Sequence, residues 1–340
     1  MSFKKATVNA GSVAATLSNY PTYVALDRVG IASLAEAQSS RWYTDVDKIN
    51  EVAREVVSAD EGHGKIPSLT TTTELYIDYD GIRSDYAVGA TYGRNAVWSD
   101  YESVVHMQSD ATDSTGNGDG TINGTTFSGV GQIGNGGVFD GSDYLNMGDK
   151  AVLTGLTAQM WAKKDSASGN QMLFHRGNSS GVNEAFYLFY LQSGNRMEAT
   201  VKTNLTQVYY AAALPSSVTA LRMYHFTFDM TNIRLYQNAS LFGTSGTVAG
   251  TTINDTATQE LFLGAFNGPS IYWDGDQDEF RLRDTALSQD WITTEYNNQN
   301  DEATFWGTWT DAAAGGGSSI KSIDGVLKAN IKSFNGVELA

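Results

Sequence analysis

Short β-prone runs broken by turn residues recur along the chain, and this punctuation limits the fold more than any other feature. Between residues 138 and 300 the turns fall at intervals of roughly 8 to 15 residues, the spacing of a β-sandwich or jelly roll. The 35 glycines and the frequent Thr, Ser, Asn and aromatic residues favour short strands joined by tight turns. We therefore predict an all-β protein.

Eight candidate strands stand out in the second half of the chain. They are Leu156–Ala162, Met172–His175, Ala185–Leu191, Met197–Thr203, Tyr224–Asp229, Ile233–Gln237, Glu260–Leu263 and Asp278–Arg283. A helix is expected over Ser288–Asn297, with Ser288 as its N-cap. In the first half, the alternation of Leu75, Ile77 and Tyr79 predicts a half-buried strand, and residues 32–38 suit one short helix.

A chain of 340 residues suits two domains better than one. The composition changes over 108–137, where Ser114–Gly120 and four later glycines predict a linker. We therefore predict two tandem β-sandwiches, the first over 1–107 and the second over 138–305. A second linker is expected over 306–319, because it contains an Ala-Gly-Ser run.

The last segment, 320–340, is repetitive. Ile-Lys-Ser-Ile-Asp-Gly-Val begins at Ile320, and Ile-Lys-Ser-Phe-Asn-Gly-Val begins 11 residues later at Ile331. Asp-Gly and Asn-Gly between apolar residues are strong hairpin signals. Each repeat is too short to bury a core alone, so the tail is expected to dock on a larger body or on itself.

Charge and cysteine content exclude several functions. The formal net charge of −16 opposes binding to nucleic acid and to anionic lipid. The sequence has no cysteine, which excludes a disulfide framework, a zinc ribbon and a thiol nucleophile. No stretch reaches the ~20 apolar residues of a membrane span, and the first residues lack the apolar run of a signal peptide. We expect synthesis in the cytoplasm.

Two phrases resemble the ends of laminin-G-like, concanavalin A-like jelly-roll domains. Residues 138–147 (VFDGSDYLNM) are similar to the opening strand of that family. Residues 276–292 (DQDEFRLRDTALSQDWI) are similar to its closing strand and helix, and residues 224–228 and 233–239 match its central strand pair. The resemblance covers about 120–300 and implies a jelly roll.

The two flanking regions resemble other families. Residues 1–107 are similar to an uncharacterised β-sandwich family that precedes laminin-G-like domains in bacterial and phage proteins. This similarity lies in residues 19–24 (NYPTYV), 41–45 (RWYTD), 65–69 (KIPSL) and 79–81 (YDG). The terminal repeats resemble short tails of tailed-phage structural proteins.

The laminin-G-like resemblance also implies a structural Ca²⁺. In many such domains an aspartate of the closing strand holds the ion together with backbone carbonyls near the opening strand. Here the aspartate would be Asp278, and the carbonyls would be those around Asp140 and Gly141. The alternative is that Asp278 binds backbone amides at the sandwich edge. The sequence from Asp274 is no EF-hand, because its sixth position is Glu279.

A sugar site would need an exposed aromatic platform beside planar polar groups. Tyr272 and Trp273 next to an aspartate fit this description, as do His175, Arg176 and Asn178 in an expected loop. The alternative is that Trp273 packs inside the sandwich and the loop is solvated.

Enzymatic function is not expected. Glycosidases of this fold need two carboxylates across a cleft. Asp274, Asp276 and Asp278 alternate along a strand, but no glutamate follows at the required spacing, and Glu279 is expected on the opposite face. The four histidines, His63, His106, His175 and His225, are not spaced as a metal cluster.

Three functional classes follow. The first is a phage virion surface protein, as a decoration, fibre or tail-associated component, made in the host cytoplasm and released on lysis. Its partners would be other virion proteins and host or environmental glycans, and a homo-oligomer stays open. The second is a bacterial envelope or exported carbohydrate-binding and adhesion module. The third and weakest is a glycan hydrolase.

Overall fold

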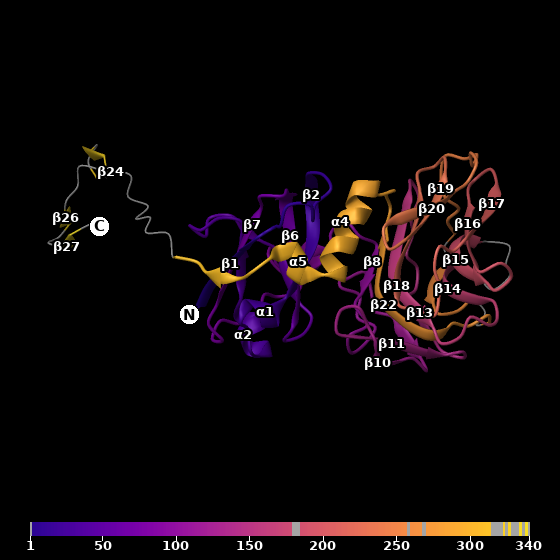
Figure 1. Ribbon diagram of the computed structural model, residues 1–340, viewed down its shortest axis with the longest axis horizontal. Coiled ribbons are helices and arrows are strands. Elements are labelled where there is room, and N and C mark those ends of the chain that lie inside the picture. Colours follow the sequence, from indigo (N-terminus) through magenta and orange to yellow (C-terminus); the bar gives the residue numbers. More distant parts are fainter. Residues whose placement is uncertain are drawn as a thin grey trace.

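The computed structural model describes residues 2–178, 184–256, 259–266 and 270–313, together with four two-residue strands of the tail. Figure 1 shows two β-sandwiches side by side along the longest axis of the molecule. Most of the regular structure is antiparallel sheet, and the helices are short. The predicted all-β fold with two sandwiches is confirmed.

The first sandwich pairs a five-stranded sheet with a three-stranded sheet. The strand orders are β23-β1-β7-β3-β4 and β2-β6-β5. Their bounds are β1 (Ser2–Thr7), β2 (Leu17–Ala25), β3 (Arg41–Tyr43), β4 (Glu51–Val52), β5 (Arg54–Val56), β6 (Glu61–Leu69), β7 (Glu74–Tyr79) and β23 (Thr310–Asp311). Apolar residues of both sheets, with the wholly buried Trp42 among them, form one core.

Three short helices belong to the same half of the chain: α1 (Leu26–Val29), α2 (Leu34–Ser39) and α3 (Arg94–Val97). Helix α2 agrees with the helix predicted over 32–38. Its N-cap Ser33 accepts a hydrogen bond from the Glu36 amide, and the Glu36 carboxylate accepts one from the Ala32 amide. This arrangement resembles a capping box and satisfies amides that a helix start leaves free.

The size of the Trp42 side chain explains the two glycines in the Glu-Gly-His-Gly sequence of strand β6. A Cβ atom at Gly64 would lie 2.5 Å from the Trp42 ring, and one at Gly62 would lie 3.0 Å from it. Glycine at both positions therefore lets the indole lie flat against the strand. Because side chains alternate along a strand, Glu61 and His63 point away from this core.

The second sandwich is a jelly roll of two large sheets. The eight-stranded sheet has the order β10-β11-β22-β13-β18-β19-β20, with β8 also paired to β22, and the seven-stranded sheet has the order β17-β16-β15-β14-β21-β12-β9. The bounds are β8 (Ser103–Val105), β9 (Thr121–Asn123), β10 (Thr126–Val130), β11 (Asn135–Asp140), β12 (Tyr144–Asn146), β13 (Leu156–Lys164), β14 (Gln171–Gly177), β15 (Glu184–Leu191), β16 (Arg196–Lys202), β17 (Gln207–Ala213), β18 (Arg222–Phe228), β19 (Ile233–Gln237), β20 (Ser240–Thr244), β21 (Glu260–Leu263) and β22 (Asp274–Arg283). A second apolar core fills the space between the two sheets.

The glycine-rich stretch over 108–137 is part of the jelly roll rather than a linker. It contains β9, β10 and the start of β11. A Cβ at Gly136 would lie 2.9 Å from the Gln277 carbonyl oxygen, and one at Gly131 would lie 2.5 Å from the Asn135 carbonyl oxygen. The glycines are therefore needed for close approach of backbones within the sheet.

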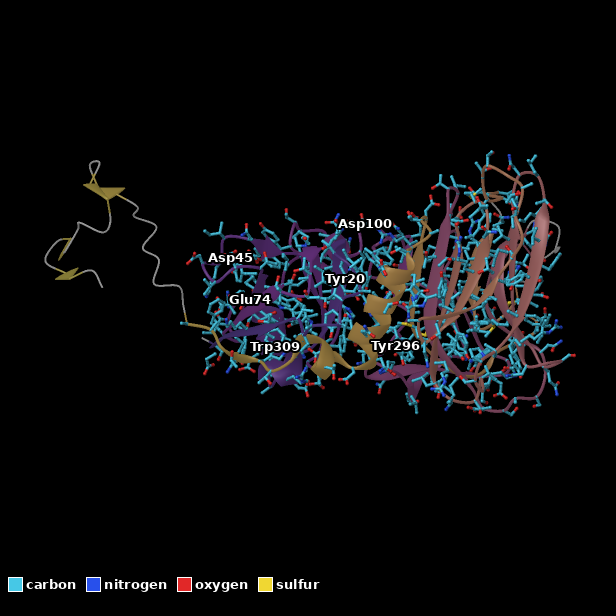
Figure 2. All side chains as sticks on the ribbon, turned by 45° about the horizontal axis from the view of Figure 1, so that its top comes forward. Tyr20, Asp45, Glu74, Asp100, Tyr296 and Trp309 are labelled. Atoms are coloured by element: carbon cyan, nitrogen blue, oxygen red, sulfur yellow. The ribbon has the colours of Figure 1, made fainter. Side chains whose placement is uncertain are left out.

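The chain returns to the first sandwich after β22, so the structure places a boundary earlier than the predicted end at 305. Helix α4 (Gln289–Asn300) begins with Ser288, whose side chain caps the Trp291 amide as predicted. Helix α5 (Glu302–Trp306) and β23 follow, and β23 pairs with β1. Residues 306–311, expected as linker, thus complete the first sandwich; Figure 2 labels Trp309 in this segment.

Strand β22 contains a β-bulge at Glu279, which has a positive φ of 51°. Gln159 pairs with Arg281 and Trp161 pairs with Asp278, so one residue of β13 faces two of β22. A bulge places two consecutive side chains on the same face of the sheet. The expectation that Glu279 and Asp278 lie on opposite faces is therefore wrong.

The tail contains two short antiparallel pairs. Strand β24 (Ser322–Ile323) pairs with β25 (Val326–Leu327), and β26 (Ser333–Phe334) pairs with β27 (Val337–Glu338). These pairs agree with the predicted hairpins, although the Asp-Gly and Asn-Gly turns lie outside the described residues. Among the helices that the structure describes, none is both long and apolar enough to cross a membrane.

If the C-terminal segment is integral to the first sandwich, Trp306→Ala will destabilise it strongly. The Trp306 ring is wholly buried in the first core, and its Nε1 donates to Thr22 Oγ1 at 3.2 Å. We expect a loss of about 3 to 5 kcal/mol in the free energy of unfolding, measured by urea denaturation with circular dichroism. Ile82→Ala, at a side chain that is 87% exposed, is the control and should change it by less than about 0.5 kcal/mol. Equal midpoints for the two variants would contradict this packing.

Candidate functional site

The two sheets of the jelly roll differ in what covers their outer faces. Helix α4 lies on the outer face of the eight-stranded sheet, between the two sandwiches, and Figure 2 labels its Tyr296 there. The Tyr296 ring stacks on Trp161 with centroids 5.9 Å apart, and Trp161 Nε1 donates to Gln299 Oε1 at 2.7 Å. The outer face of the seven-stranded sheet points away from the first sandwich (Figure 1) and is the candidate functional surface.

A single transverse row of residues crosses this outer face from one edge strand to the other. Strand pairing places one residue of each strand in the row, in the order Tyr209, Thr200, Tyr187, His175, Phe262, Asn146 and Thr121. Seven strands at the usual spacing make the row about 28 Å long. Four of its seven residues have aromatic rings, namely Tyr209, Tyr187, His175 and Phe262, and the other three are polar.

The β17 end of the row is the accessible part. Tyr209 is 59% exposed, and its ring centroid lies 6.4 Å from that of Tyr187. The Phe189 ring lies 6.3 Å from Tyr187 on the same face. Thr200 is wholly buried between the two tyrosines. We call Tyr187, Phe189 and Tyr209 the tyrosine platform.

Polar groups border the tyrosine platform. The Tyr187 hydroxyl donates to Glu198 Oε1 at 3.0 Å, and Gln207 Nε2 donates to Glu184 Oε2. Burial raises the pKa of the Tyr187 hydroxyl well above its usual value, so this group stays a neutral donor. Burial also raises the pKa of Glu184, against the opposing effect of Gln207. The border thus offers carboxylate and amide groups beside rings, as a sugar site requires.

The centre of the row is covered. His175 is wholly buried, and the Phe266 ring lies 4.2 Å from it. Burial lowers the pKa of His175 to about 3, so the imidazole is neutral at physiological pH. His175 therefore lies in β14 on the candidate face, rather than in the loop expected for the sugar site, and it supports that face from beneath.

The other residues predicted for sugar binding are divided between the face and the core. The Tyr272 ring is partly exposed and lies 6.5 Å from the ring of Tyr144, which neighbours Phe262. Trp273 is wholly buried in the jelly-roll core, so it cannot be the exposed platform. Asn178 directly follows β14 and is partly exposed.

Arg176 lies in β14 rather than in the expected loop, and its side chain is wholly buried. Its Nη2 contacts Asp149 at 2.7 Å and Asp255 at 2.6 Å, and its Nη1 donates to Gln259 at 2.9 Å. Through these contacts the guanidinium joins β14 to the neighbouring loops that contain its three partners. The structure therefore gives Arg176 a supporting position instead of a place at a sugar site.

The residues proposed for calcium do not meet. Asp140 pairs with Asp274, four residues along β22 from Asp278, which is about 13 Å away at the usual strand rise. Asp278 Oδ2 instead accepts hydrogen bonds from the amides of Gln132 and Ile133, at 2.7 and 3.1 Å. The geometry matches the alternative reading, in which Asp278 binds backbone amides.

No pattern in the sequence indicated the tyrosine platform at Tyr209. Its strand β17 reads Gln-Val-Tyr-Tyr-Ala-Ala-Ala, and β20 is also short and polar in part, so neither was among the predicted strands. Tyr187 and Phe189 lie in β15, where nearly every residue is apolar or aromatic. Such a run does not reveal which face is exposed.

Comparison with known proteins agrees with the jelly roll. The model of the concanavalin A-like lectin/glucanases superfamily (Laminin_G_3) matches residues 139–293. No curated protein matches the sequence.

Among similar solved structures is domain 4 of AbnA, a GH43 extracellular arabinanase from Geobacillus stearothermophilus, in complex with arabinotriose. It is 19% identical over 57% of this chain and 96% of that chain, with a TM-score of 0.46. The CBM40 of the Ruminococcus gnavus IT-sialidase, bound to α2,3 sialyllactose, is 17% identical over 42% and 82%, with a TM-score of 0.37. The botulinum neurotoxin serotype G binding domain is 14% identical over 61% and 54%, with a TM-score of 0.46.

At these identities, and with TM-scores below 0.5, the three likenesses say nothing about what this chain binds. The family match and the observed strand order rest on different observations and agree with each other. Residues 139–293 therefore form a laminin-G-like jelly-roll domain of the concanavalin A-like superfamily.

Proposed function

We propose that this protein is a non-catalytic carbohydrate-binding protein, and that its tyrosine platform binds a sugar chain laid across the outer face of the seven-stranded sheet. The observation that carries the proposal is the 59% exposed Tyr209 beside the Tyr187 ring. An exposed aromatic ring presents a flat apolar surface that suits the C–H face of a pyranose, and its hydroxyl adds a polar contact. The match to the lectin superfamily supports the same function.

The polar border would supply the orienting contacts. Glu198 and Lys202 lie on β16, each two residues from Thr200, so their side chains lie on the same face as that of Thr200. Gln207, on β17, pairs with Lys202. Carboxylate, ammonium and amide groups can each bind sugar hydroxyls. These groups border Tyr209 at the accessible end of the row.

A non-catalytic role is supported by the positions of two aspartates of β22, Asp276 and Asp278. Asp276 contacts Lys163 Nζ at 2.8 Å, and Asp278 binds backbone amides. In both contacts the carboxylate binds another group of the jelly roll itself. Both aspartates lie on the sheet that faces α4. Hydrolysis would instead need an acid and a base on opposite sides of a bound glycosidic bond.

We further propose display on a virion surface, with the jelly roll outward and the first sandwich or the tail as the anchor. This part rests on the terminal repeats and on the resemblance of residues 1–107 to domains of bacterial and phage proteins. A bacterial envelope or exported adhesion module would use the same tyrosine platform.

Replacing the exposed tyrosine tests the binding function. Tyr209→Ala should weaken binding to any polysaccharide retained by the wild type about tenfold, because the lost ring contact is worth about 1.4 kcal/mol. The measurement is affinity electrophoresis or a glycan array with neutral and acidic polysaccharides. Leu241→Ala, at a 49% exposed side chain of the other sheet, is the matched control and should bind as the wild type does.

Two results would count against the platform. Retention of none of the polysaccharides by the wild type would remove the binding function. Unchanged binding by Tyr209→Ala would place the sugar site elsewhere on the molecule.

The net charge of −16 predicts a preference among glycans. At low ionic strength we expect neutral polysaccharides to bind better than acidic ones, because like charges repel over about 10 Å at 0.1 M salt. Raising the NaCl concentration should strengthen binding to acidic polysaccharides and leave binding to neutral ones nearly unchanged. Stronger binding to acidic chains at low salt would show that local cations such as Lys202 decide the contact.

Immunogold electron microscopy of phage particles from the source lysate tests the virion placement. Gold over the head is the result expected of a decoration protein, and gold at the tail is expected of an adhesin or fibre component. Particles that stay unlabelled would overturn the virion placement and favour the envelope module.

A further inference from the structure

A buried group of ionisable side chains lies where the two sandwiches meet. Glu61 and His63 come from β6 of the first sandwich, His106 follows β8, and Glu279 lies at the bulge of β22 in the jelly roll. All four side chains are buried, and one nitrogen or oxygen atom of each lies within 4.8 Å of the others. We call these four residues the interdomain cluster.

The interdomain cluster is close to the size of a tetrahedral metal shell. His106 Nδ1 lies 2.5 Å from Glu279 Oε1 and 3.4 Å from Glu61 Oε1. His63 Nε2 lies 3.0 Å from the same Glu61 oxygen. Ligands bound to Zn²⁺ at 2.0 to 2.1 Å stand about 3.3 Å apart. Shifts of well under an ångström in most of these contacts would therefore open room for an ion.

Further residues orient the four side chains. His106 Nε2 lies 3.1 Å from Glu55 Oε2, and Glu55 also accepts from Trp98 Nε1 and Ser114 Oγ. A histidine that ligates zinc commonly donates its second ring N–H to a carboxylate in this way. Arg281 Nη2 donates to Glu279 Oε2 at 2.6 Å, which leaves Oε1 directed at His106.

His63 is the second buried imidazole of the cluster. Its ring is wholly buried, and its Nδ1 has no hydrogen-bond partner in the part of the chain that the structure describes. Its Nε2 lies 3.0 Å from Glu61 Oε1 and is the ring nitrogen that would bind an ion. A neutral imidazole has an unshared electron pair on one nitrogen, which is the form that binds a metal ion.

Several carboxyl groups surround the cluster. The region holds five buried carboxylates, those of Glu55, Glu61, Asp278, Glu279 and Glu295. Arg281 is the permanently charged cation in contact with two of them. A divalent cation would add positive charge to this group of carboxylates.

The β-bulge gives the cluster a local backbone feature of its own. Glu279 adopts φ of 51°, which a non-glycine residue in a central strand seldom does. The bulge turns Glu279 toward the first sandwich, while its neighbours Gln277 and Phe280 face the jelly-roll interior. Backbone strain of this kind persists only where its surroundings enforce it, and it concentrates at functional sites.

We propose that Glu61, His63, His106 and Glu279 bind one divalent transition-metal ion of the Zn²⁺ type, which joins the two sandwiches. Two imidazoles and two carboxylates are a ligand set for zinc, whereas Ca²⁺ takes six to eight oxygen ligands. The ion would take the place of the proton between His106 and Glu279. The proposal is independent of sugar binding, because the cluster lies on the opposite side of the jelly roll from the tyrosine platform.

A pocket adjoins the cluster at His106. This pocket of about 240 Å³ opens between the first sandwich and residues 106–114, and His106 and Glu55 form part of its lining. Asp85 and Asp110 also line the pocket, together with Arg54 and Arg94.

Metal content and thermal stability of the full chain test the proposal. Protein dialysed against EDTA and then given one equivalent of Zn²⁺ should retain one ion per chain by mass spectrometry of metals. Excess Zn²⁺ should raise Tm by about 5 °C or more, and Ca²⁺ and Mg²⁺ should not. Co²⁺ in the same site should give the strong visible absorption of four-coordinate cobalt.

Variants separate the interdomain cluster from other sites. Glu61→Gln and His63→Gln should each remove the stoichiometric ion and the Zn²⁺-dependent rise in Tm. His225→Gln is the matched control, because His225 is an equally buried histidine that contacts Glu295 at 3.0 Å outside the cluster; it should keep both. Wild-type protein that binds no Zn²⁺, or variants that keep the full rise in Tm, would overturn the proposal. If a variant fails to fold, a weak six-coordinate Co²⁺ spectrum of the wild type would overturn it equally.

Discussion

The joint between the two sandwiches depends on the buried guanidinium of Arg281. It contacts Glu279 at 2.6 Å and Glu295 at 2.9 Å, and it lies 4.9 Å from the ring centre of Trp98. These partners come from the jelly roll, from α4 and from the segment that connects the sandwiches. Removing one partner of a buried ion pair leaves a charge without compensation, which costs about 3 to 5 kcal/mol. The network therefore ties the jelly roll to α4 and to the connecting segment.

This joint also decides which surface of the jelly roll is left for binding. The eight-stranded sheet presents polar side chains outward, His225 and Arg281 among them, and α4 meets them with Glu295 and Gln299. Helix α4 in turn binds the first sandwich, where Asn298 Oδ1 accepts from the Tyr23 amide at 2.7 Å. Helix α4 makes polar contacts with both sandwiches. This explains why its sequence is largely polar. The seven-stranded sheet keeps its outer face, where the exposed ring of Tyr209 lies.

Sequence patterns predicted the strands better than their assembly. All eight strands predicted between 156 and 283 exist, because alternation and turn residues are local signals. The glycines of 108–137 have the composition of a linker, yet Gly131 and Gly136 allow close backbone contacts in a sheet. His63 and His106 meet only through tertiary packing, so their spacing could not reveal the interdomain cluster. The bulge at Glu279 leaves no trace in the residue pattern, and it reverses the face on which a key carboxylate lies.

The chain crosses between the sandwiches twice, once before β8 and once after β22, and it then closes the first sandwich with β23 beside β1. The jelly roll is therefore connected to the first sandwich at both of its chain ends rather than at only one. A force applied to its outer face would be shared by the two chain connections and by the buried contacts between the two sandwiches. Its orientation would consequently be retained under shear, which is a mechanical advantage for a module that grips a surface while its base is anchored.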